Sequence, residues 1–336
     1  MTRRLTWPAL CAMVALAGAS PGCKCGAPGN DAANGSDAGA DSGPGSDGGL
    51  PTTGPSKVTA VASSGFHSPT DAVASPDGAT FYFAAYTEDP DPQPAIFSVP
   101  AAGGKPSVRV QGAPLGHPTG LVLSCEGDTL YVADMESAVA SGADGGDVLA
   151  VVLASDTIAV AGVTGIETPA GLAMGPDCAT LFVTGWDADG VPSVFTAPAA
   201  GGKASVLYGG APLASPTGLH VDSDETAWVL DHLAVGANGE GALFSITMDG
   251  ALAEVASGLR LGDPGGVSLA AGGRTVVIAG RDAAGAGELL TVDVASGATA
   301  TVDASALIDP AGLRTARGAG VFAVVDSEGG AIFRAE

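Results

Sequence analysis

One short motif recurs along the chain at nearly constant spacing. A proline, a variable residue, a glycine and an apolar residue form PTGL from Pro118, PAGL from Pro169, PTGL from Pro216, PGGV from Pro264 and PAGL from Pro310, and a degenerate copy, PTDAV, begins at Pro69. The spacings between the six prolines are 49, 51, 47, 48 and 46 residues. Such a period is typical of architectures in which every repeat is one structural unit.

Each repeat contains four short apolar runs. In the second repeat they cover residues 120–124, 129–133, 147–153 and 156–162. Runs of this length that alternate or are continuously apolar predict buried strands, and Gly- and Asp-rich turns such as SPDG at 75–78 favour tight hairpins between them. Four strands in about 48 residues predict one propeller blade. The sequence therefore predicts an all-β, six-bladed β-propeller of four-stranded blades.

The last repeat contains only three of the four runs before the chain ends. The missing run is found at the start of the domain, because KVTAVASSG at 57–65 resembles LAEVASG, the fourth run of the fourth repeat, at 252–258. We therefore expect the N-terminal strand to complete the last blade and to close the ring without an exposed gap.

The N-terminal part of the 336-residue chain differs from the repeats. Arg3 and Arg4 precede a short apolar segment at 10–18, which predicts a secretory signal (1–22) too short to span a bilayer. Cleavage after Ala19 is one route, and lipidation of Cys23 as a lipoprotein is the route we favour. Residues 23–56 are rich in Gly, Ala, Ser, Asp and Pro and predict a disordered tether, which leaves 57–336 for the propeller.

The propeller region is strongly acidic, with ten Lys and Arg against 32 Asp and Glu. This balance argues against nucleic acid and against anionic membrane surfaces, so we expect membrane contact only through the lipid anchor. We interpret the acidity as solubility of an exported monomer. Cation binding is the alternative.

The Pro-x-Gly motif, the acidic turn and runs such as LYVAD together resemble the NHL-repeat propellers and the six-bladed regucalcin/gluconolactonase group over residues 57–336. The latter resemblance implies a divalent cation at the channel mouth, held by an early Glu and by an Asn and an Asp that directly follow two motif prolines. In this chain those positions hold no good oxygen ligand for a dication: they are Thr70, Thr119, Ala170, Thr217, Gly265 and Ala311. The resemblance supports the architecture and leaves the activity open.

The side of the ring where first runs start and second runs end is the expected functional rim. Our candidates for binding at the channel mouth are His117, Asp134, Asp231, Asp326, His220 and Arg314. The candidate ligands for Ca²⁺, a cation that takes six to eight oxygens, are Asp71, Asp134, Asp231, Asp263, Asp309 and Asp326. The alternative is that each Asp caps its own turn by accepting backbone N–H groups.

Two cysteines fall in equivalent turns of adjacent repeats, Cys125 and Cys178, and in an oxidising compartment they are candidates for a disulfide. No nucleophile motif is present. We therefore favour a non-enzymatic propeller that binds a protein, peptide or glycan. The alternative is a metal-dependent lactone or ester hydrolase of the regucalcin type.

Overall fold

The computed structural model describes residues 54–88, 90–137, 145–234, 240–270, 272–315 and 320–336. The predicted signal, Cys23 and residues 23–53 of the predicted tether lie outside the described residues. Within the described part of the chain, no helix has the length and hydropathy of a membrane span.

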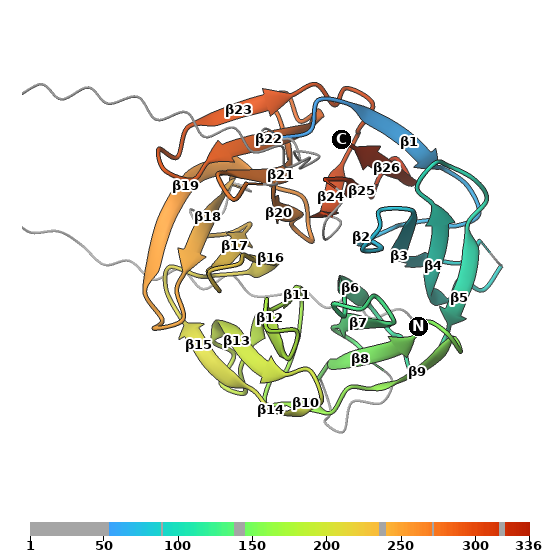
Figure 1. Cartoon of the computed structure of the whole chain (residues 1–336), viewed down its shortest axis with the longest axis horizontal. Coiled ribbons are helices and arrows are strands. Elements are labelled where there is room, and N and C mark those ends of the chain that lie inside the picture. Colours follow the sequence, from blue (N-terminus) through green and yellow to red (C-terminus); the bar gives the residue numbers. More distant parts are fainter. Residues whose placement is uncertain (1–53, 89, 138–144, 235–239, 271, 316–319) are drawn as a thin grey trace, which may run out of the picture. The chain divides into compact units, whose positions relative to one another are not determined.

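Six four-stranded antiparallel sheets, here called blades 1 to 6, follow one another around a ring (Figure 1). Blade 1 comprises β2 (Ala72–Ala74), β3 (Thr80–Tyr86), β4 (Pro94–Pro100) and β5 (Ser107–Gln111). Blade 2 comprises β6 (Pro118–Leu123), β7 (Thr129–Asp134), β8 (Asp147–Val152) and β9 (Thr157–Val160). Blade 3 comprises β11 (Leu172–Met174), β12 (Thr180–Trp186), β13 (Pro192–Pro198) and β15 (Ser205–Gly209).

The second half of the ring repeats this order. Blade 4 comprises β16 (Pro216–Val221), β17 (Ala227–Asp231), β18 (Glu240–Ile246) and β19 (Leu252–Arg260). Blade 5 comprises β20 (Val267–Leu269), β21 (Thr275–Arg281), β22 (Gly287–Asp293) and β23 (Thr299–Val302). Blade 6 comprises β24 (Pro310–Thr315), β25 (Phe322–Asp326), β26 (Ala331–Ala335) and β1 (Val58–Ala62). A short parallel pair, β10 (Val163–Thr164) and β14 (Gly202–Lys203), lies between blades 2 and 3. The predicted fold class is confirmed.

The N-terminal strand β1 is the outer strand of the blade that contains the C-terminus (Figure 1). It pairs antiparallel with β26, from Val58 opposite Ala335 to Ala62 opposite Ile332. The Lys57 amide also donates to the Glu336 carbonyl at 3.0 Å. These bonds join the two ends of the repeat array.

The core lies between neighbouring blades. One cluster joins Ala84 and Ile96 of blade 1 to Leu121, Leu130 and Leu149 of blade 2, all fully buried. Each blade therefore buries both faces, which explains why most inner runs are continuously apolar rather than alternating.

The motif glycines allow the inner strands β2, β6, β11, β16, β20 and β24 to approach one another closely around the channel. A Cβ atom built on Gly218 of blade 4 would lie 2.6 Å from the carbonyl oxygen of Gly265 in blade 5. The residue before the motif glycine reinforces the same contact, since the Thr119 hydroxyl of blade 2 donates to the Ala170 carbonyl of blade 3 at 3.0 Å. A side chain at Gly218 would therefore force blades 4 and 5 apart.

Gly218→Ala should lower the free energy of unfolding by about 1–3 kcal/mol, because the new methyl group meets backbone that cannot rotate away. Gly145→Ala is the matched control, because a Cβ there would lie 3.4 Å from the nearest atom, at ordinary contact distance. Urea unfolding of both variants measures the difference. Equal stability of the two variants would contradict the close-approach explanation.

Candidate functional site

A cavity of about 670 Å³ occupies one end of the central channel. Its wall includes inner-strand residues of all six blades and residues of the turns that join the first and second strands of blades, here called the A–B turns. Pro76, Ser124, Pro176 and Ser223 are such turn residues. The cavity therefore lies at the A–B turn end of the ring, and its volume falls in the range of ordinary ligand pockets.

The fourth residue after each motif proline lines this cavity. In blades 1 to 3 these residues are apolar: Val73, Val122 and Ala173. In blades 4 to 6 they are polar or charged: His220, Ser268 and Arg314. The wall is therefore mainly apolar on one side of the channel at this level and polar on the other. Of the six predicted channel-mouth candidates, the structure places His220 and Arg314 in this wall.

Hydrogen bonds order the polar half of the wall. The Ser268 hydroxyl lies 3.3 Å from His220 Nδ1 and accepts the Thr315 amide at 3.0 Å. Thr315 Oγ1 donates to the Leu269 carbonyl at 3.1 Å and also contacts Ser268 Oγ. Ser268 is fully buried, so its hydroxyl positions neighbours and is not presented to a ligand.

A buried ion pair joins blades 6 and 1 at the wall of the cavity. Arg314 Nη2 of blade 6 lies 3.2 Å from Oδ2 of Asp71 at the start of blade 1, and Arg314 Nη1 donates to the Leu219 carbonyl of blade 4. Asp71 Oδ2 also accepts the Leu121 amide of blade 2 at 2.8 Å. Burial raises the pKa of Asp71, and the positive charge of Arg314 opposes that rise. Two side chains thus tie together four blades.

Asp71 stands where the other five repeats have the motif glycine. The degenerate copy PTDAV therefore marks a change of role, because its carboxylate takes the space at the channel and bonds to the next blade. Asp71 is one of the candidate Ca²⁺ ligands predicted from the sequence, and that role stays a prediction. In the structure both of its carboxylate oxygens accept backbone amides, and Oδ2 also bonds to Arg314. The signal in the sequence was an Asp at a glycine position together with a channel-facing Arg.

Three acidic residues at the opposite end of the ring cap turns of blades 2, 4 and 6. Their exposures are 0%, 0% and 1% for Asp134, Asp231 and Asp326. Each carboxylate accepts three backbone amides at 2.7–3.0 Å: those of Gly116, His117 and Glu136; of Ala214, Ser215 and Leu233; and of Ile308, Asp309 and Gly329. Burial raises the pKa of Asp134, and these amide bonds oppose the rise. The three carboxylates thus make the turn-capping bonds of the alternative prediction, and their role at a channel mouth stays a prediction.

The remaining rim candidates have separate environments. Asp309 pairs with Arg281, and the 65% exposed Asp263 side chain lies 3.9 Å from His232 Nε2. His117 Nδ1 lies 3.1 Å from the Tyr86 hydroxyl. Among the residues that the structure describes, no three His, Cys, Asp or Glu side chains form a group that could hold a metal ion. The six predicted Ca²⁺ ligands are not brought together.

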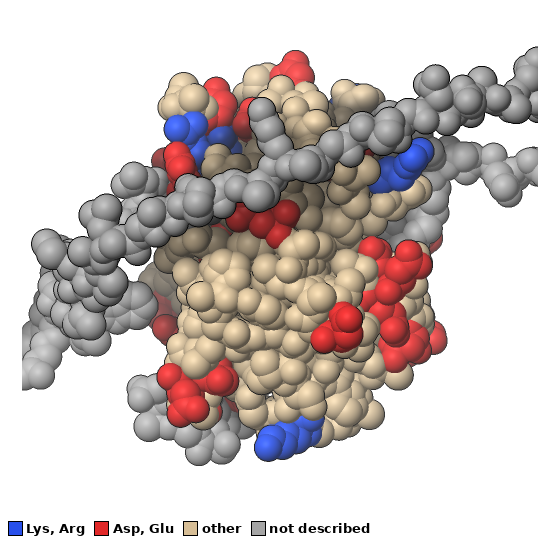
Figure 2. Space-filling view, turned by 90° about the vertical axis from the view of Figure 1, so that its left-hand side faces the viewer, with Lys and Arg blue, Asp and Glu red and all other residues tan. Residues whose placement is uncertain are grey.

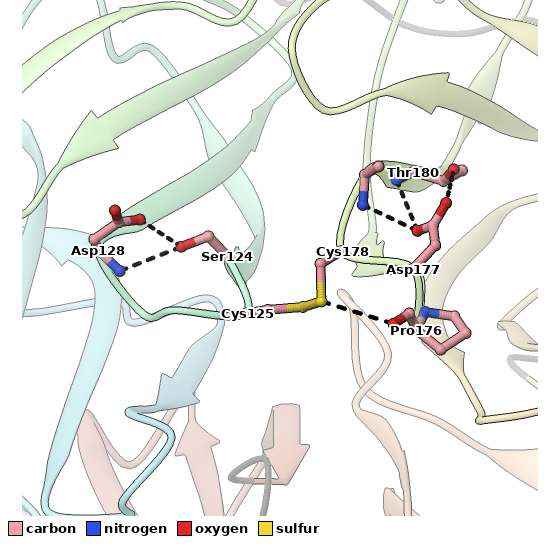
Figure 3. Close-up of a disulfide and its surroundings, with 8 residues drawn as sticks. Ser124, Cys125, Asp128, Pro176, Asp177, Cys178 and Thr180 are labelled. Atoms are coloured by element: carbon pink, nitrogen blue, oxygen red, sulfur yellow. Dashed lines mark hydrogen bonds between the residues drawn. A yellow bond between two sulfur atoms is a disulfide. The ribbon is translucent and has the colours of Figure 1, made fainter.

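A disulfide joins the A–B turns of blades 2 and 3 beside the cavity (Figure 3). Its residues are Cys125 and Cys178, with Cα atoms 5.6 Å apart. Both flanking turns are further fixed by carboxylates, because Asp128 accepts the Ser124 hydroxyl at 2.8 Å and Asp177 accepts the Thr180 hydroxyl at 2.7 Å. The cavity wall is covalently held on its apolar side.

Comparison with known proteins places the chain by fold. It is similar to a structural-genomics protein of unknown function from Bacteroides thetaiotaomicron VPI-5482, with TM-score 0.59 and 15% identity over 85% of this chain and 74% of that one. It is also similar to a chain of the nidogen/laminin complex, with TM-score 0.53 and 16% identity over 70% and 87% of the two chains. Hydrazine synthase of Kuenenia stuttgartiensis gives TM-score 0.53 and 15% identity over 79% and 75%.

No family model and no curated protein matches the sequence. At these identities the similarities define the class, a six-bladed β-propeller, and no more than the fold.

Arg314→Met should lower the free energy of unfolding by about 3–5 kcal/mol, because it leaves the Asp71 carboxylate buried without its cation. The loss should shrink as the pH falls. In the variant the pKa of Asp71 rises further above its value in the unfolded chain. As the pH falls, the Asp71 carboxyl is therefore protonated in the folded state while it is still ionised in the unfolded chain, and this difference favours the folded state. Urea unfolding between pH 7 and pH 5 measures both effects.

The double variant Asp71→Asn/Arg314→Met controls for simple loss of packing. The Asn side chain keeps an acceptor for the Leu121 amide and carries no charge, so the double variant should be more stable than Arg314→Met alone. If the stability lost in the double variant equals the sum of the losses in Arg314→Met and in Asp71→Asn, the two side chains are not coupled.

Proposed function

We propose that this chain is an exported, lipid-anchored and non-enzymatic binding propeller that receives a protein, peptide or glycan at the A–B turn end of its channel. The observation that carries the proposal is the cavity lined from all six blades. Arg314 of the buried ion pair is part of the cavity wall, and a ligand would enter between the A–B turns that also line it.

The surroundings of the cavity support a binding role. A closed ring and a disulfide hold the wall in place before any ligand arrives, and preorganisation of this kind lowers the entropic cost of binding. The mixture of apolar and polar wall suits a ligand with both kinds of surface. No observation among the described residues favours the alternative, a metal-dependent lactone or ester hydrolase, or the Ca²⁺ that it would use.

Val122→Phe should weaken ligand binding at least tenfold, because the larger side chain enters the cavity from its apolar half. Peptide and glycan arrays probed with the full chain identify ligands, and titration with each hit measures the loss. Val206→Phe on the outer strand β15, where Val206 is 55% exposed, is the matched control and should bind normally. Hits that bind both variants equally, with unchanged thermal midpoints, would contradict a cavity site.

The lipid anchor is tested separately. Cells that make the full chain should incorporate labelled palmitate into the protein, and Cys23→Ser should abolish the label and release the protein from the membrane fraction. A soluble product whose N-terminus is Ser20 would instead indicate cleavage after Ala19.

A further inference from the structure

The A–B turns around the cavity carry an excess of carboxylates. Within their described residues there are seven acidic side chains and one cation, Arg274; the acids, here called the acidic mouth, are Asp77, Glu126, Asp128, Asp177, Asp222, Asp224 and Glu225. Asp222 and Asp224 line the cavity directly. Among the described residues, none of the seven forms an ion pair.

Local bonds keep several of these carboxylates ionised. The Ser75 hydroxyl holds the pKa of Asp77 below its usual value, and the Ser124 hydroxyl does the same for the pKa of Asp128. For Asp177 the Ala179 amide is the main cause of a lowered pKa. These three carboxylates therefore carry negative charge at neutral pH, and within the described A–B turns only Arg274 offsets the seven acidic side chains.

Deeper in the cavity the charge is balanced. Arg314 is neutralised by Asp71, and the opposite wall carries Val73, Val122, Ala173 and Met174. A ligand that fits both levels needs an apolar group inside and positive charge at the mouth. Resting on the binding function proposed above, we propose that the ligand is a basic peptide segment that inserts an apolar side chain into the cavity and places Lys or Arg residues against the acidic mouth.

Charge argues against two other occupants of the cavity, the N-terminal segment of this chain and a second copy of the chain. Residues 26–56 contain four Asp and no Lys or Arg, and a second copy of the chain carries a formal charge of −23, so the mouth repels both. The outer wall seen in Figure 2 is largely uncharged, with separate acidic patches and a few basic groups. An inorganic cation would meet the acidic mouth and leave the apolar wall uncovered.

The test uses the full chain and a fluorescein-labelled eight-residue peptide with a central Leu-Phe pair and four Lys residues, followed by fluorescence anisotropy. Two matched peptides replace the four Lys with Gln or with Glu. The Lys peptide should bind, the Gln peptide should bind at least tenfold more weakly, and the Glu peptide should not bind. Raising the salt concentration should weaken binding of the Lys peptide, since exposed charges are screened within about 10 Å at 0.1 M salt.

A matched pair of variants locates the charge effect. Glu126→Gln/Asp224→Asn/Glu225→Gln removes three mouth charges. It leaves unchanged Asp128 and Asp222, the carboxylates whose hydrogen bonds order these turns. It should weaken Lys-peptide binding about tenfold. The control Glu136→Gln/Glu167→Gln/Glu328→Gln removes three exposed charges at the opposite end of the ring and should leave binding unchanged.

Two outcomes would overturn the inference: equal binding of the Lys and Gln peptides, or equal loss in the two triple variants. If a neutral peptide or a glycan binds and Val122→Phe abolishes that binding, the ligand class is wrong and the cavity function stands. If Val122→Phe changes the binding of no ligand, the proposed function itself fails.

Discussion

Close contact between the inner strands of neighbouring blades is the constraint on which this structure depends. Where the motif glycine is present, the backbones of neighbouring inner strands lie against each other around the channel. Gly218 shows the contact directly, and the Thr119 hydroxyl strengthens its counterpart between blades 2 and 3. The motif glycines therefore permit five of the six contacts between neighbouring inner strands, and Asp71 makes the sixth through its bond to the Leu121 amide.

The first repeat, which departs from the motif, places a buried ion pair at the channel. Asp71 replaces the glycine and pairs with Arg314 of the adjacent blade 6, and Arg314 also donates to the Leu219 carbonyl of blade 4, so polar bonds link several blades at this level. On one side of the pair lies the cavity with its acidic mouth. At the opposite end of the ring, the carboxylates of Asp134, Asp231 and Asp326 accept hydrogen bonds from backbone amides of the turns. Aspartates at both ends accept bonds from their turns, but those at the opposite end are buried, whereas Asp77, Asp128 and Asp177 of the acidic mouth are exposed.

The sequence predicted the architecture well because period and strand pattern are local properties. The four runs of the second repeat agree closely with β6 to β9, and β1 occupies the place in blade 6 that its similarity to the fourth run of repeat four indicated. The candidate site was harder to predict. Sequence can count carboxylates at a rim, but whether Asp134 meets water or three backbone amides depends on the path of a neighbouring turn. The bond between Asp71 and Arg314 could not be predicted for the same reason, since the two residues lie 243 positions apart in the chain.

The central claim is that ligands enter at the A–B turn end and not at the opposite end. Methionine methyl NMR tests it directly, because Met174 lines the cavity, Met135 follows β7 at the opposite end and Met248 is 46% exposed on an outer turn. On titration of the full chain with the Lys peptide, we predict that the Met174 methyl signal shifts while those of Met135 and Met248 stay in place. A shift of Met135 with Met174 unchanged would contradict the account.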